Sequence, residues 1–254
     1  GSIVTPLKDR IGSQILTHYP DSIKIAKTIT AQEAKLDKRQ SELVHVPELA
    51  KDLLEQISFE ARESEFIDEK SGISARLSIT AYENLLSTAE RRSLKSGDDK
   101  TLLRFGDFLG VVPSITGKVE LVYEGEEEGA ASVALQLIGD SVKTLFPQYF
   151  PKIEKLQKPD ETTPYDDLVE WFFEQSGFEL PDDLSDAGYK EKLDSVEPLN
   201  ELITKYQPEF SEKDSYFLKE FLLWALVEYK KLSKHRFATG VQFKDLYGSY
   251  ISDL

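Results

Sequence analysis

Apolar residues recur every three or four positions along most of the chain, the spacing that places them on one face of a helix. The run "YFLKEFLLWALVEYKKL" has almost no polar face, so we expect its helix to be buried on most of its surface. The pattern predicts helices over residues 21–36, 47–71, 78–97, 105–109, 124–146, 165–175, 187–206 (interrupted at Pro198) and 215–234. The clearest apolar stripe consists of Leu49, Leu53, Leu54, Ile57 and Ala61.

Several expected helix ends carry residues that suit them. Asp21 or Ser22 offers a side-chain oxygen to the free N–H groups of the first helix, and Ser78 does the same for the third. Gly72 is expected to break the second helix, and Gly97 is a suitable C-terminal stop because glycine tolerates the left-handed conformation there.

Two short stretches predict strands. Residues 13–17 are largely apolar, and residues 118–124 follow a predicted turn at 113–117 with alternating apolar and polar side chains. The expected fold class is mostly α, a helical bundle and a second helical domain with these short β segments. We expect a terminal piece of an α/β core over 1–20, a helical lid over 21–112 and a C-terminal helical extension over 113–254.

The stretch "GVVPSITGKVELVYEGEEEG", residues 110–129, contains a Gly-Lys pair that invites comparison with a nucleotide-binding loop. Such a loop has the spacing G-x-x-x-x-G-K-[ST], in which the first glycine shapes the backbone around phosphates and the hydroxyl holds Mg²⁺. Here Val112 occupies the first glycine position and Val119 occupies the hydroxyl position. The chain therefore contains no phosphate-binding loop of this type.

Charge and composition exclude several classes of function. The net charge of −15 is opposite to that needed to bind a nucleic-acid backbone or an anionic membrane surface. The chain has no long apolar run, and its lack of cysteine is compatible with a reducing compartment, so we expect a cytoplasmic protein. Three scattered histidines and a run of glutamates typical of a helix N-terminus predict no metal site.

Two segments resemble a known family. The stretch "PLKDRIGSQILTHYP" places Arg10 in a loop before an apolar strand, and "SGISARLSITAYENLLSTAERRSL" places Ser74 and Arg76 at the start of a helix. Together with "ITGKVELVYEGEEEG", these segments are similar to the end of the core and the lid of AAA+ ATPases, in the branch of the magnesium chelatase ATPase subunit and the MoxR-like proteins. The resemblance covers roughly residues 5–125 and fades after about residue 150.

The resemblance implies a role for each arginine. Arg10 matches the arginine finger, a permanently charged fork offered in trans to the γ-phosphate in a neighbouring subunit. Arg76, in a Ser-x-Arg element that begins with Ser74, matches the sensor 2 arginine that contacts the γ-phosphate in cis. The implied cofactors are ATP and Mg²⁺ in a longer parent protein. The fragment itself, without a phosphate loop, is expected to bind neither and to be inactive.

The resemblance also implies partners. Both arginine roles require a homo-oligomeric ring, by analogy a hexamer, that remodels a partner protein, in this family often one with a metal-dependent adhesion-type domain. The chelatase branch inserts metal into porphyrin, but similarity to the ATPase subunit does not fix the substrate.

Two alternatives remain open. One is an ion pair of Arg76 with Asp68 or Glu69, which would leave it without a role in nucleotide binding. The other is a non-catalytic, acidic helical module for protein interaction that has kept a lid-like shape.

Overall fold

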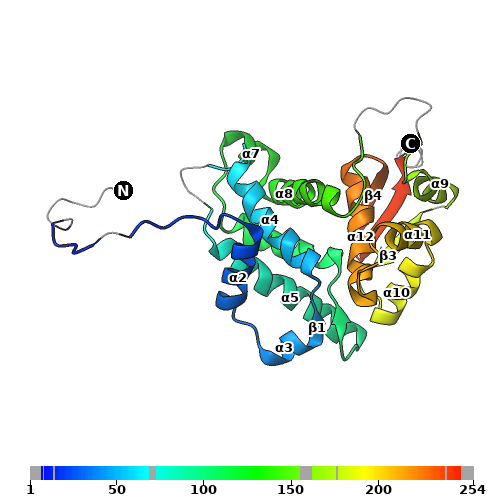
Figure 1. Ribbon diagram of the computed structural model, residues 1–254, viewed down its shortest axis with the longest axis horizontal. Helices are drawn as coiled ribbons and strands as arrows, with labels where there is room; N and C mark the ends of the chain where they lie inside the picture. Colours follow the sequence, from blue (N-terminus) through cyan, green and yellow to red (C-terminus); the bar gives the residue numbers. More distant parts are fainter. Residues whose placement is uncertain are drawn as a thin grey trace.

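The computed structural model describes residues 7, 9–13, 15–68, 73–154, 162–175, 177–237 and 239–246. This part of the chain is mostly helical with a few short strands, which confirms that the protein is mostly α. The division into segments 1–20, 21–112 and 113–254 stays a prediction. Figure 1 shows one group of helices around α4 and α5, and a second group in which α12 lies beside a small sheet.

The first group is built from helices that the apolar pattern predicts. Ser22 caps the first of them, since its Oγ accepts a hydrogen bond from the N–H of Ile25, and the stripe predicted on α4 is buried. A short parallel ladder joins β1 to β2. The elements are α2 (Ile23–Glu33), α3 (Lys38–Leu43), β1 (Val44–His45), α4 (Glu48–Glu63), α5 (Arg76–Ser96), β2 (Thr101–Leu102), the 3-10 helix η1 (Phe105–Val111), α6 (Val112–Thr116), α7 (Tyr123–Glu128), α8 (Ala130–Leu145) and the 3-10 helix η2 (Phe146–Gln148).

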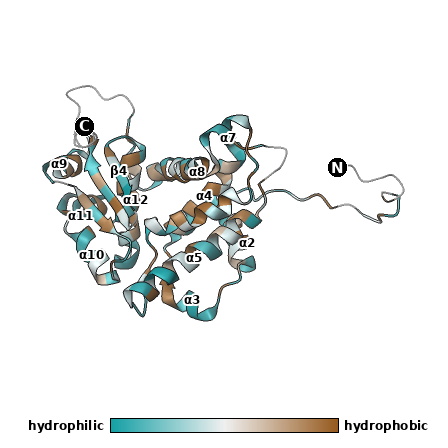
Figure 2. Cartoon of the chain, turned by 180° about the vertical axis from the view of Figure 1, so that it is seen from behind, coloured by the Kyte–Doolittle hydropathy of each residue, from teal (hydrophilic) through white to brown (hydrophobic). Residues whose placement is uncertain are grey.

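The second group surrounds α12, which is buried on most of its surface as predicted. Its residues Phe217 and Trp224 stack against Phe105 of η1, so the two groups share one apolar core. The elements are α9 (Asp166–Glu174), β3 (Phe178–Pro181), α10 (Asp186–Asp194), α11 (Glu197–Tyr206), α12 (Glu212–Glu228), β4 (Leu232–Phe237) and β5 (Gly240–Asp245). Figure 2 shows the same arrangement from behind, with apolar residues on the facing sides of the helices.

The C-terminal sheet is the largest departure from the predicted helical extension. Strand β5 lies between β3 and β4, antiparallel to both, with Phe178 opposite Phe243. The helix predicted over residues 215–234 ends at Glu228, and Lys230 follows in the left-handed conformation. The chain then forms the β4–β5 hairpin, whose buried residues pack against α9 and α12.

Neither predicted strand belongs to a sheet in the described part of the chain. Among the described residues, the segment 118–124 forms only an isolated bridge between Leu121 and Ile67, and α7 begins at Tyr123. Within α7, Gly125 lies so close to the carbonyl oxygen of Phe66 that a Cβ would come within 2.4 Å of it, which explains the glycine at this position. Residues 13 and 15–17 pair with no strand in the described part of the chain.

Three predicted helix ends also differ. Helix α4 ends at Glu63, well before Gly72, which lies outside the described residues. Helix α5 begins at Arg76, so Ser78 lies inside its first turn, where its hydroxyl contacts that of Ser58 at 2.7 Å. The helix predicted over 124–146 is divided at Gly129, whose φ of 88° is incompatible with a continuous helix.

A buried carboxyl group joins three helices of the first group. Glu55 of α4 is 2% exposed, and its Oε1 accepts a hydrogen bond of 2.6 Å from Thr30 of α2. Ser78 of α5 is a further hydrogen-bonding neighbour. Burial, the largest influence, raises the pKa of Glu55 above its ordinary value of 4.5.

We expect Glu55→Gln to stabilise the protein at neutral pH and above. A carboxyl group whose pKa is raised by folding holds its proton more tightly in the folded state, so its contribution to stability falls as pH rises above about 4.5. The glutamine amide is neutral at every pH, so the variant does not lose stability in this way as the pH rises. Chemical denaturation of both proteins between pH 4 and pH 9 tests this, and a difference that does not grow with pH would contradict it.

Candidate functional site

Arg10 lies on an exposed arm. The dark-blue segment that precedes α2 runs away from the helices in Figure 1. At residues 11–13 and 15–20 its backbone forms no hydrogen bond with the backbone of another described residue, and Ile15 and Leu16 are 85% and 75% exposed. Arg10 is exposed in a turn near the far end of the described arm, where its N–H donates to the carbonyl of Leu7.

The arm is fixed to the body at its near end by a cation–π contact. The guanidinium carbon of Arg62, on α4, lies 4.4 Å from the ring centre of Tyr19 and 5.1 Å from that of Phe59. Burial lowers the pKa of Arg62, and its Nε has no hydrogen-bond partner in the part of the chain described. The arm therefore has a defined point of departure from the helical body.

Arg76 is the first residue of α5 and is exposed. Ser74 accepts a hydrogen bond from the Arg76 N–H through its Oγ, at 3.2 Å, which orders the entry into the helix. Among the described residues, neither Arg76 nor Arg10 belongs to the lining of the clefts formed by α5 with the C-terminal sheet or with α10.

A large cleft lies elsewhere, between the two groups of helices. Its volume is about 990 Å³, and it is bounded by α5 and η1 on one side and by the C-terminal sheet on the other. Basic side chains gather there although the chain as a whole is strongly acidic. The charged residues of its lining are Arg91, Arg92, Lys95, Arg104, Asp107, Asp182, Asp183, Glu220 and Arg236.

Arg92 forms a buried, bidentate ion pair with Asp107. Its Nε lies 3.1 Å from Oδ1 and its Nη2 lies 2.8 Å from Oδ2. The remaining nitrogen donates to the hydroxyl of Thr101, and Nη2 also reaches the carbonyl of Leu102. Although burial alone would lower the pKa of Arg92, Asp107 raises it. Four of the five N–H groups of this guanidinium, and all three of its nitrogens, are therefore engaged within the fold.

Arg104 is buried with only a long ion pair, since its Nη2 lies 3.8 Å from Oδ1 of Asp186, which also accepts hydrogen bonds from Thr101 and Leu102. It is 4% exposed, and its guanidinium lies 4.3 Å above the ring of Tyr189. Its Nη2 donates to the carbonyl of Leu184, whereas Nε and Nη1 have no partner among the described residues. Burial, and next the nearby charge of Arg92, lower the pKa of Arg104. The inner wall of the cleft thus contains an incompletely compensated cation.

Glu220 of α12 binds the N-terminus of η1. Its carboxylate accepts hydrogen bonds from the N–H groups of Phe105 and Gly106, at 2.7 and 3.3 Å, and from the hydroxyl of Tyr189 at 2.8 Å. Glu220 is 1% exposed, and burial raises its pKa. Burial and then Glu220 raise the pKa of Tyr189 well above its usual range. This carboxylate therefore satisfies free helix N–H groups and is not available to a ligand.

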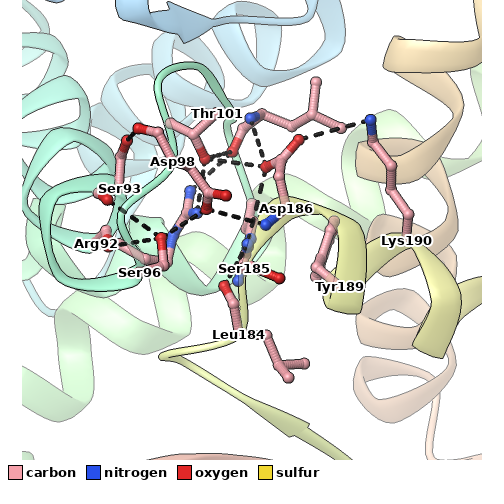
Figure 3. Close-up of polar contacts among 12 residues, drawn as sticks. Arg92, Ser93, Ser96, Asp98, Thr101, Leu184, Ser185, Asp186, Tyr189 and Lys190 are labelled. Carbon is pink, nitrogen blue, oxygen red and sulfur yellow. Dashed lines mark hydrogen bonds and ion pairs between the residues drawn. The ribbon is translucent and has the colours of Figure 1, made fainter.

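A second polar network connects the segment after α5 with the start of α10 (Figure 3). Asp186 accepts hydrogen bonds from the Thr101 hydroxyl and the Leu102 N–H, both at 3.0 Å, and forms an ion pair with Lys190. Its own N–H donates to Asp98, which also accepts from Ser96. These bonds hold the loop after α5 against the start of α10, which keeps the adjoining wall of the cleft in place.

Sequence reasoning missed this cleft because its charged residues come from four separate parts of the chain. The nearest signal is the context of Arg104 in "LLRFGDFL", a lone arginine between apolar residues. An arginine in such a run is expected to be buried, and a buried charge needs a partner or a ligand.

No family model, curated protein or solved structure matches this chain. Within the described ranges, no group of three or more histidine, aspartate or glutamate side chains is arranged to hold a metal ion. The helices of the same ranges include none that is both long and apolar enough to cross a membrane.

Proposed function

We propose that these residues form the end of the core, the lid and the C-terminal extension of an oligomeric AAA+ ATPase, similar to the magnesium chelatase and MoxR-like ATPases. In this proposal Arg10 acts in trans on the γ-phosphate held by a neighbouring subunit. Arg76 contacts the γ-phosphate in cis, with Ser74 ordering the helix start beside it. ATP and Mg²⁺ are bound by an α/β core outside the 254 residues.

The observation that supports this proposal most strongly is the exposed arm. Ile11, Ile15 and Leu16 are large apolar residues on an extended, unpaired backbone, a combination that favours pairing with a sheet. Addition of this arm to the edge of an α/β core would bury those side chains and satisfy the backbone groups. Arg10, immediately before it, would then lie at the end of a core strand.

The position of Arg76 suits contact with an anion. An exposed guanidinium at the N-terminus of a long helix lies at the positive end of the helix dipole, which is locally unfavourable. A phosphate group brought to this end would be attracted both by the free N–H groups and by the arginine. In a ring, Arg76 would act at the nucleotide of its own subunit and Arg10 at that of a neighbour. Their positions on different parts of the chain are compatible with these separate roles.

The proposed partners are other copies of the chain in a ring and a protein that the ring remodels. Rotation of the helical lid during hydrolysis would move the second group of elements, because η1 and α12 share one apolar core. That acidic C-terminal part would transmit the movement to the partner.

We expect Arg76→Ala to weaken ATP binding by roughly tenfold to a hundredfold, because a hydrogen bond to a charged group contributes about 1.5–3 kcal/mol. ATP affinity and steady-state ATP turnover are measured on the full-length natural protein. Arg39→Ala, an exposed arginine on α3, is the matched control and should leave both unchanged. Unaltered ATP affinity in Arg76→Ala would contradict the sensor role.

The competing proposal, a non-catalytic acidic module for protein interaction, gives a different result in the same assay. It predicts no ATP turnover in the wild type at any protein concentration. Turnover that is absent, or indifferent to both arginines, would favour this second function, in which the arm serves only to bind another protein.

A further inference from the structure

The cleft between α5 and the C-terminal sheet has an excess of unpaired positive charge. Two of its acids are held in bidentate ion pairs, Asp107 with Arg92 and Asp182 with Arg236. Glu220, as described above, is engaged by backbone N–H groups and Tyr189. Asp183 is the one remaining carboxylate of the lining.

Three cations remain for a ligand. Arg91 and Lys95 lie one turn apart on α5, are exposed, and form no ion pair with any described residue. Arg104 lies deeper, with Nε and Nη1 lacking partners as noted above. The 3.8 Å ion pair with Asp186 compensates this buried charge only in part, so an anion close to Arg104 would be bound with an electrostatic gain.

We propose that this cleft is a binding site for a compact anion bearing two or more phosphate groups. Arg91 and Lys95 would bind the outer phosphate and Arg104 would attract the inner one. Asn84 and Ser87 lie on the same lining. The Asn84 amide keeps one N–H beside its bond to Ser114, and the Ser87 hydroxyl accepts from Gln40 and keeps its own hydrogen for a ligand. The volume of about 990 Å³ accommodates a small molecule of this kind.

The chemistry of the lining favours a phosphate-rich ligand over a nucleotide base or a nucleic acid. No aromatic residue lines the cleft in the described structure, so a base would find no ring to stack on. A long polyanion would also meet the net charge of −15 outside the cleft, whereas a compact anion would not extend beyond the basic walls.

This site is distinct from the proposed ATP contact at Arg76. Fifteen residues of α5 separate Arg76 from Arg91, which is about 22 Å along a helix that rises 1.5 Å per residue. The two sites can therefore be tested separately, and the phosphate site does not depend on the ATPase proposal.

Calorimetric titration of the 254-residue chain with tripolyphosphate, without ATP or metal, tests the proposal. We expect saturable binding at one site, weakened at least roughly tenfold in the double variant Arg91→Gln/Lys95→Gln, since each charge-assisted hydrogen bond contributes about 1.5–3 kcal/mol. The control is Lys24→Gln/Lys38→Gln, which removes two exposed positive charges far along the chain from the cleft. It should bind like the wild type.

Amide chemical shifts in the presence of tripolyphosphate locate the site. We expect changes at residues 84–95 and 104–106, and none at Ser74 or Arg76. Absence of saturable binding would overturn the proposal. Equal weakening in the control double variant would also overturn it, because it would show general attraction to charge. Shift changes confined to the start of α5 would assign the binding to Arg76 instead.

Discussion

Replacing Arg10 by alanine is expected to reduce steady-state ATP turnover by on the order of a thousandfold or more, at unchanged oligomer size. An arginine supplied in trans stabilises negative charge that develops on the transferred phosphoryl group, and its loss typically has an effect of this size. Arg10 is exposed on the arm, so its truncation should leave folding intact. Arg39→Ala is again the control and should turn over ATP at the wild-type rate.

A mixing experiment separates action in trans from action in cis. Rings formed from Arg10→Ala subunits together with Arg76→Ala subunits contain interfaces at which one subunit supplies an intact Arg76 and its neighbour an intact Arg10. We expect turnover to reappear in the mixture although each variant alone is defective. If mixing restores nothing, Arg10 does not serve a neighbouring subunit's site, and the finger assignment is wrong.

The helices were predictable because the residues that each helix buries recur every three or four positions in the sequence. The stripe from Leu49 to Ala61 and the stop at Gly97 are present as expected, and Gly97 adopts φ 78°. The predicted helix boundaries were wrong where tertiary contacts determine the residue at which a helix begins. Ser78 is drawn into the first turn of α5, where its hydroxyl is buried against Ser58.

The C-terminal sheet was not predictable from local pattern. Strand β4 begins at Leu232, soon after the apolar helix α12 ends at Glu228, and its sequence "LSKHRF" lacks the apolar–polar alternation of a strand. Only pairing with Gly240–Asp245 fixes it as a strand, and β3 is joined to β5 across some sixty residues of sequence. The unpredicted strands β3 and β5 form one wall of the cleft, so the site was missed for the same reason.

Arg92→Ala is expected to lower the free energy of unfolding by about 3–5 kcal/mol, the effect of removing one partner of a buried ion pair. The variant would leave the Asp107 carboxylate buried without its cation, and would free the Thr101 hydroxyl and the Leu102 carbonyl. These groups connect the end of α5 with β2 and η1, so the loss affects the packing of η1, whose Phe105 stacks against Trp224 of α12. The measurement is urea denaturation at neutral pH.

The adjacent Arg91→Ala provides the matched control, since it removes the same side chain from an exposed position on the same helix. It should change the free energy of unfolding by no more than about 0.5 kcal/mol. Equal losses in the two variants would show that helix propensity, rather than the buried pair, determines stability here. A small loss in Arg92→Ala would mean that Asp107 finds other partners, for example the N–H of Arg104 that it already accepts at 2.8 Å. The cleft wall would then not depend on the Arg92–Asp107 pair.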